Sequence, residues 1–154
     1  MAVRTGEVVA EAQKCIWIAA LLCGCIAAAG TDESRIGYLI VTEARARPTP
    51  PGVSVGVVYF SISNQGAKAD RLLSVSTPIA RKVEIHESRI EHGVVEMREV
   101  SSVNCPPGAT VRAMPGGLHV MLIGLAAPLA PGSEFTLSLQ FRDAGPLTMK
   151  VPVV

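Results

Sequence analysis

The sequence predicts an all-β domain, because its apolar residues come in short runs that Gly and Pro interrupt. These runs are rich in Val, Ile, Leu and Thr, which is typical of strands in a β-sandwich or barrel. The 11 prolines and 14 glycines are spread through the chain and disfavour long helices. Of the 154 residues 49% are apolar, enough for the core of one domain with an extension.

The chain is expected to begin with an export segment over residues 1–29. The run from Cys15 to Ala29 is uncharged and mostly apolar. Its length suits the h-region of a signal peptide and is shorter than the roughly 20 residues of a membrane-spanning helix. The small residues Ala27-Ala28-Ala29 suit signal peptidase, so cleavage there is one outcome and an uncleaved anchor is another.

A third outcome for this segment is lipidation. Leu22-Cys23-Gly24-Cys25 resembles a bacterial lipobox, in which Cys25 would carry the lipid and become the first mature residue. Cys23 is unusual at its position in such a box. All three outcomes place the domain outside the cytoplasm, in the bacterial cell envelope or periplasm, either soluble or anchored to the membrane.

A short polar linker is expected over residues 30–35, followed by the β-domain over residues 36–154. Alternation and turn residues predict nine strands in the domain. They lie near Tyr38–Glu43, Val53–Asn64, Arg71–Ser76, Lys82–His86, Val94–Val100, Thr110–Ala113, His119–Ile123, Glu134–Phe141 and Leu147–Val153. Gly145-Pro146 should turn the last two into a hairpin.

Only one of the four cysteines, Cys105, lies in the expected domain, so no disulfide can form within it. Cys105 precedes Pro106-Pro107-Gly108, a turn signal. We expect it to be a small apolar residue at the end of a strand.

Two imidazoles and two thioethers carry the candidate chemistry, in the pattern His86-x10-Met97-x21-His119-x-Met121. On a strand, His119 and Met121 point to the same face because they are two residues apart. A hairpin turn centred between Glu91 and His92 would set His86 opposite Met97, close enough to share an ion.

These neutral, soft donors favour one metal ion in particular, Cu(I). Mg²⁺ and Ca²⁺ prefer oxygen ligands, and structural zinc sites use Cys, His and carboxylate. Of the remaining candidates, His92 lies in the turn and should be solvated, and Met114 could guard the entrance of the site. Met149 alternates with apolar neighbours and should pack in a strand.

The four-residue pattern resembles the motif of the PCu(A)C copper chaperones, small β-proteins of the bacterial cell envelope. The spacing agrees at all four positions, and flanking segments such as Met114–Met121 and Leu137–Phe141 are also similar. The resemblance covers roughly Ile36 to Val154. It implies a cupredoxin-like Greek-key sandwich that binds one Cu(I) per chain and acts as a monomer. It further implies delivery to the binuclear copper centre of cytochrome c oxidase, with the oxidase copper subunit or a thioredoxin-like copper chaperone as partner.

Several other functions are disfavoured by the sequence. The formal net charge of +1 and the lack of a basic run argue against a nucleic-acid partner. No nucleophile set, phosphate loop or paired-carboxylate motif indicates an enzyme, and alternation is taken to turn Glu84 and Glu87 away from His86. A blue-copper electron carrier needs a Cys thiolate in its site. Here Cys105 is the only candidate and the usual closing Cys-His-Met loop is absent, so this function is disfavoured. Envelope copper storage or tolerance and a copper-free interaction module remain alternatives.

Overall fold

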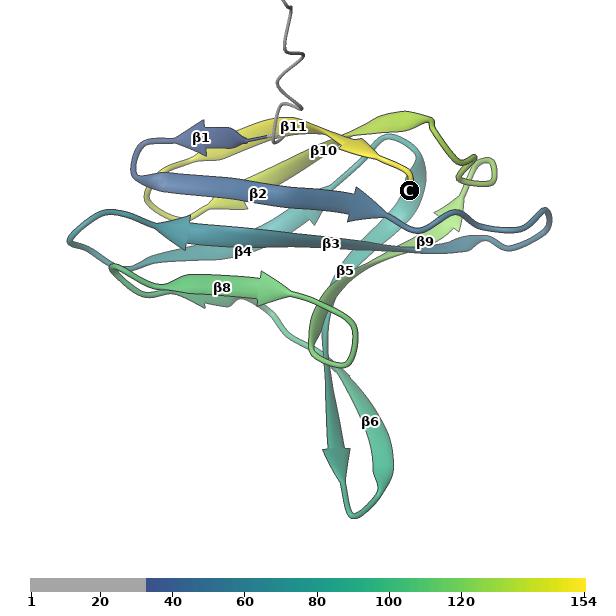
Figure 1. The fold of residues 1–154 in the computed structure, drawn as a ribbon, viewed down its shortest axis with the longest axis horizontal. Helices are drawn as coiled ribbons and strands as arrows, with labels where there is room; N and C mark the ends of the chain where they lie inside the picture. The colour runs from purple at the N-terminus through teal and green to yellow at the C-terminus, as the bar shows by residue number, and fades with distance from the viewer. Residues whose placement is uncertain (1–32) are drawn as a thin grey trace, which may run out of the picture.

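The computed structural model describes residues 33–154, so the expected export segment and the start of the linker lie outside the described residues. The described part contains only strands and turns (Figure 1). The strands are β1 Ser34–Ile36, β2 Leu39–Ala46, β3 Val55–Asn64, β4 Asp70–Ser76, β5 Ala80–Glu91, β6 Val94–Glu99, β7 Val103–Cys105, β8 Thr110–Ala113, β9 Leu118–Leu125, β10 Glu134–Phe141 and β11 Pro146–Pro152. Within residues 33–154, no helix has the length and apolar character needed to cross a membrane.

The strands form two sheets that pack face to face. A seven-stranded sheet has the order β1-β2-β3-β8-β9-β5-β6, and a four-stranded sheet has the order β11-β10-β4-β7. The long strand β3 pairs with β9 along its first half and with β8 along its second half. Such a two-layer arrangement lets each sheet bury one face and leave the other for function.

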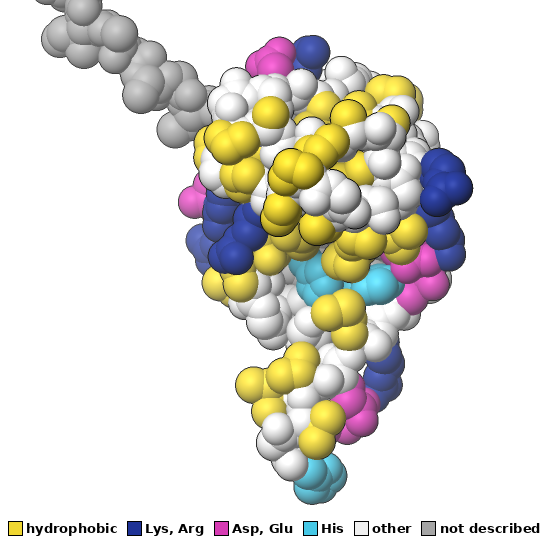
Figure 2. All heavy atoms as spheres, turned by 90° about the vertical axis from the view of Figure 1, so that its right-hand side faces the viewer, with side chains coloured by type: hydrophobic (Ala, Val, Ile, Leu, Met, Phe, Trp, Pro, Cys, Tyr) yellow, Lys and Arg dark blue, Asp and Glu magenta, His cyan; other side chains and the backbone are white. Residues whose placement is uncertain are grey.

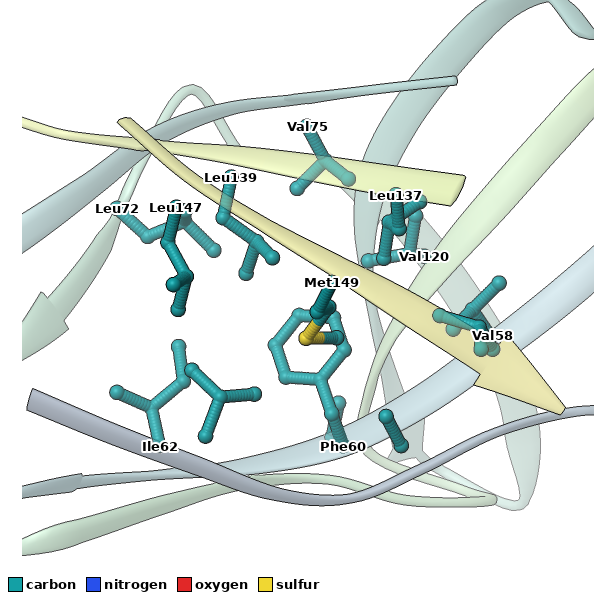
Figure 3. Close-up of a cluster of buried hydrophobic side chains, with 14 of the residues drawn as sticks. Val58, Phe60, Ile62, Leu72, Val75, Val120, Leu137, Leu139, Leu147 and Met149 are labelled. Atoms are coloured by element: carbon teal, nitrogen blue, oxygen red, sulfur yellow. The ribbon is translucent and has the colours of Figure 1, made fainter. Parts of the chain in front are cut away.

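The core fills the space between the two sheets. Its fully buried side chains include Ile62 on β3, Leu122 on β9 and Leu139 on β10. Figure 3 shows side chains from both sheets filling this space, among them Met149 and Phe60, which belong to the same buried cluster. Burial alternates along β9, because Val120 and Leu122 point into this core and Met121 between them points to the other face.

All nine predicted strands are present, and the all-β prediction is confirmed. The structure adds two three-residue strands, β1 and β7, which are too short to show a periodic pattern. Gly145 has a φ of 89° and turns β10 into β11 as predicted. Strand β1 begins at Ser34, inside the predicted linker.

The single cysteine of the domain is the last residue of β7. Cys105 is free and fully buried, as the sequence led us to expect of a small apolar strand-end residue. Burial raises the pKa of its thiol above the ordinary value. A thiol that is buried and protonated is poorly suited to bind or exchange metal.

Strand β5 is much longer than predicted, and its second half pairs only with β6. The two strands form a hairpin arm, residues 87–99, that projects from the sandwich (Figure 1). Its two-residue turn consists of His92 and Gly93, with φ values of 53° and 82°. Two successive residues with positive φ are what a type I′ turn requires, and this turn suits the twist of a two-stranded ribbon.

Candidate metal centre

The register of the hairpin arm differs from the predicted one. Glu91 pairs with Val94, so His86 lies opposite Glu99 and Met97 lies opposite Ser88. The prediction that His86 faces Met97 directly across the hairpin is therefore wrong. The two-residue turn at His92-Gly93 moved the register by two residues, because both residues could adopt positive φ. A shift of two keeps each side chain on its face, so Met97 is a diagonal neighbour of His86.

The strand pairings place all four predicted site residues on one face of the larger sheet. His119 on β9 lies directly opposite His86 on β5. Met121 follows on the same face of β9 and pairs with Glu84 of β5 and with Val57 of β3. Figure 2 shows histidine side chains at the waist between the sandwich and the arm, with hydrophobic side chains above and below them.

The two histidines contact each other through their rings. The ring centroids of His86 and His119 are 5.8 Å apart, and the ring planes meet at 79°. His119 is only 6% exposed, and the side chain of His86 is 16% exposed. The nitrogens of two nearly buried imidazoles need hydrogen-bond partners or a bound ligand, and these two rings do not supply them to each other.

Each histidine has one ring nitrogen held by an acceptor. The Nε2 of His86 lies 2.8 Å from the Oε2 of Glu84, and the Nδ1 of His119 lies 2.9 Å from the backbone oxygen of Gly117. The Nδ1 of His86 is buried and has no hydrogen-bond partner among the described residues. A buried nitrogen without a partner fits a ligand position for a metal ion.

Glu84 is the site residue that the sequence analysis placed wrongly. It is two residues before His86, so alternation puts both on the same face, and only Glu87 points away. The rule that residues two apart on a strand share a face would have placed Glu84 beside His86 from the sequence alone. Glu84 also accepts a hydrogen bond from Lys82. Lys82 first, and His86 second, hold the pKa of this carboxyl below its ordinary value.

Met97 is the outlying member of the four. It lies on the arm and is 53% exposed. Met97 and Met121 are two strands and four residues apart in the ladder, about 16 Å on a flat sheet. A shared ion therefore requires the twist and bend of the arm to bring Met97 over the histidine pair.

The two faces of the arm differ in chemistry. On the face shared with the histidines it carries Ile90, Val95 and Met97, all exposed, and also Glu99, which lies opposite His86. The opposite face carries ion pairs that Arg89 makes with Glu87 and that Arg98 makes with its neighbours. The histidine pair therefore lies beside exposed apolar side chains of the arm and beside the carboxylates of Glu84 and Glu99.

The donor set proposed for the site contains two imidazoles and two thioethers. No group of three or more His, Cys, Asp or Glu within residues 33–154 could hold a metal ion. Two imidazoles completed by two thioethers form a neutral set that matches the preference of Cu(I).

The other candidate residues lie away from this cluster. His92 forms the exposed tip of the arm, as predicted. Met149 is buried in the core on β11, as predicted for strand packing. Met114 is half exposed in the loop before β9, and its side chain lies next to Gly117, whose carbonyl holds His119. That position is compatible with a guarding role at the site, which stays a prediction.

A surface hollow away from the histidine pair is formed by loops that polar side chains hold together. It is lined by residues 37–39, 64–70 and 143–144. The amide of Asn64 donates to the backbone oxygens of Lys68 and Cys105. The carboxylate of Asp70 accepts from backbone N–H groups, including those of Asp143 and Ala144. These two polar side chains therefore fasten neighbouring loops together.

Sequence comparison places the chain in a family. It matches the family described as "Putative lipoprotein LpqE-like" over residues 39–153. It is 28% identical over 128 residues to "Putative lipoprotein Lxx21020" of Leifsonia xyli subsp. xyli, covering 82% of this chain and 76% of that protein. It is 31% identical over 102 residues to "Uncharacterized protein RP573" of Rickettsia prowazekii, covering 64% of this chain and 56% of that protein.

Solved structures of similar shape are PCuAC domains and a protein of Deinococcus radiodurans. The copper-bound PCuAC domain from PmoF2 has a TM-score of 0.68 and 24% identity, covering 79% of this chain and 96% of that chain. The Cu(I) form of DR1885 from Deinococcus radiodurans has a TM-score of 0.61 and 24% identity, covering 81% and 82%. At these identities the likeness establishes the fold, and it confirms the predicted cupredoxin-like sandwich. The chain therefore belongs to the LpqE-like family of PCuAC-related proteins, as its resemblance to the PCu(A)C family predicted.

Proposed function

We propose that this protein is an extracytoplasmic copper chaperone that holds one Cu(I) through His86, Met97, His119 and Met121. The observation that carries the proposal is the histidine pair on one sheet face, with a buried ring nitrogen that has no partner among the described residues and a thioether on either side. The PCuAC domain and DR1885 structures are described as copper-bound and Cu(I)-bound, which supports the same cargo here.

Release of the ion follows from the exposure of the ligands. Met97 is the most accessible of the four and sits on the projecting arm, whereas His119 is almost fully buried. A ligand atom of the acceptor protein binds Cu(I) as the Met97 thioether leaves, and the other three ligands of this protein leave in turn. The ion stays Cu(I) throughout, so ligand exchange needs no oxidant or reductant.

The acceptor we propose is a copper protein of the envelope that offers thiolate or additional ligands. The oxidase copper subunit, with its binuclear centre, and a thioredoxin-like copper chaperone both have this chemistry. Copper storage for tolerance is the second candidate, and it predicts tight binding without rapid transfer. Transfer kinetics to an isolated acceptor domain therefore separate the two.

We propose export to the cell envelope, with lipidation at Cys25 as one route. The word lipoprotein in the description of the family and of the Leifsonia relative supports this location. Replacement of Cys25 by Ala should release the protein from the membrane fraction or block its maturation. A mature N-terminus at Gly30, read by mass spectrometry, would instead show simple cleavage.

Anaerobic titration of the purified exported protein tests the proposed function. We expect one Cu(I) per chain and a strong preference for Cu(I) over Zn²⁺, because two of the four ligands are thioethers. Met97→Leu should weaken binding, whereas Met149→Leu is a matched control that changes a thioether of the core. Several ions bound with similar affinity, or a preference for zinc, would contradict the four-ligand site.

A further inference from the structure

We propose that Glu84 is a positioning residue that holds the Nε2–H of His86 and thereby presents its Nδ1 to the copper ion. This inference rests on the proposed function for the identity of the ion, but its geometric part concerns the copper-free protein. The Nε2 of His86 is 2.8 Å from the Oε2 of Glu84, and the Glu84 side chain is only 11% exposed. Nothing in the four-residue motif assigns a role to Glu84.

The chemistry of the two partners determines which nitrogen carries the proton. A neutral imidazole has one N–H and one lone pair, and an ionised carboxylate can only accept. The short contact therefore requires the proton on Nε2, which leaves the lone pair on Nδ1. This is the same Nδ1 that is buried without a partner among the described residues. A metal ion at this position would satisfy an atom whose burial is otherwise costly.

His119 is held in the opposite way. Its Nδ1 is 2.9 Å from the backbone oxygen of Gly117, which can only accept, so its Nε2 carries the lone pair. The two histidines thus offer different nitrogens to the ion, Nδ1 from His86 and Nε2 from His119. The ring of His86 is held by a side chain, whereas the ring of His119 is held by the backbone. Only the contact to His86 can therefore be removed by substituting its partner.

Lys82 adds a second task for Glu84. The Lys82 ammonium pairs with the Oε1 of Glu84, whose other oxygen is bound to His86. Glu84 thereby compensates a positive charge next to the site of a cation. Loss of the carboxylate would remove the hydrogen bond to His86 and also leave Lys82 with only the carboxylate of Glu99 nearby. These two effects have to be separated by experiment.

Copper affinities of four variants separate them. Glu84→Ala should lower Cu(I) affinity by about 10- to 100-fold, the usual effect of losing the partner of a ligating histidine. Glu84→Gln keeps an acceptor oxygen and should recover most of this loss. The double variant Lys82→Gln/Glu84→Ala should remain weakened if the hydrogen bond matters, and should return to wild-type affinity if only charge matters. Glu87→Ala is the matched control, because Glu87 lies on the same strand and points away.

Nitrogen NMR of the imidazoles provides a readout that a purely structural role would not change. In the copper-free wild-type protein, long-range ¹H–¹⁵N spectra should show His86 protonated at Nε2 and His119 at Nδ1. Addition of diamagnetic Cu(I) should then shift the Nδ1 resonance of His86 and the Nε2 resonance of His119. A His86 proton on Nδ1, or a copper-induced shift at its Nε2, would overturn the inference even if Glu84→Ala failed to fold. A protein with the expected protonation that binds no Cu(I) would refute the proposed function and leave the positioning contact in place.

Discussion

Cu(I) affinity should fall steeply as the pH is lowered, because both proposed nitrogen ligands must be neutral to bind. Copper and protons compete for His86 and His119, whereas thioethers do not titrate. Histidine is the side chain that ordinarily changes charge between about pH 5 and 8. Where both imidazoles are protonated in the copper-free protein, each bound ion displaces two protons. The affinity then falls about a hundredfold for each unit by which the pH is lowered, since each displaced proton contributes a factor of ten.

The structure excludes the nearest other titrating group from this slope. Lys82 and His86 hold the pKa of Glu84 below its ordinary value. This carboxyl therefore stays ionised where histidines ordinarily change charge, and it becomes protonated only at more acidic pH. Replacement of either histidine by Met removes one of the two protons and should reduce the limiting slope to about tenfold per unit. The exposed His92 lies at the tip of the arm, so His92→Gln should keep the steeper slope.

The assay is an anaerobic competition for Cu(I) between pH 5 and 8, against a chromogenic ligand whose own protonation is corrected for. Circular dichroism at each pH confirms that the variants stay folded. A wild-type slope that neither His86→Met nor His119→Met alters would show that the two histidines are not both bound to the ion, and the four-ligand assignment would then fail.

Three further predictions follow from burial and position. Cys105→Ser should leave Cu(I) affinity within about threefold, and a loss of tenfold, about 1.4 kcal/mol, would show that the thiol is a ligand. The native Cys105 thiol should resist alkylation at pH 8 and react only after unfolding, because burial raises its pKa and blocks access; fast labelling would contradict this. Leu139→Ala, in the centre of the core, should lower the free energy of unfolding by about 2–5 kcal/mol in urea titrations, while a change under 1 kcal/mol would mean that the core is not packed as described.

The hairpin arm illustrates where sequence reasoning succeeded and where it failed. Alternation correctly assigned Val94–Val100 to a strand after a turn, and it placed His86 and Met97 on one face. The register failed because the turn could be centred at two places, and only the positive φ of both His92 and Gly93 chose between them. A glycine is expected to adopt this conformation, whereas a histidine rarely does.

Local spacing determined much of this protein by itself. Alternating apolar residues fixed the nine main strands and the inward face of β9, because strand periodicity is a property of neighbouring residues. The same periodicity put His119 and Met121 on one face, and it contained the information that Glu84 shares a face with His86. Tertiary structure decided what lies across from what. The order of strands brought His119 opposite His86, although 32 residues separate them in the chain. It also left one imidazole nitrogen buried without a partner among the described residues, because pairing between distant strands and the bend of the arm depend on the packing of both sheets rather than on any local pattern.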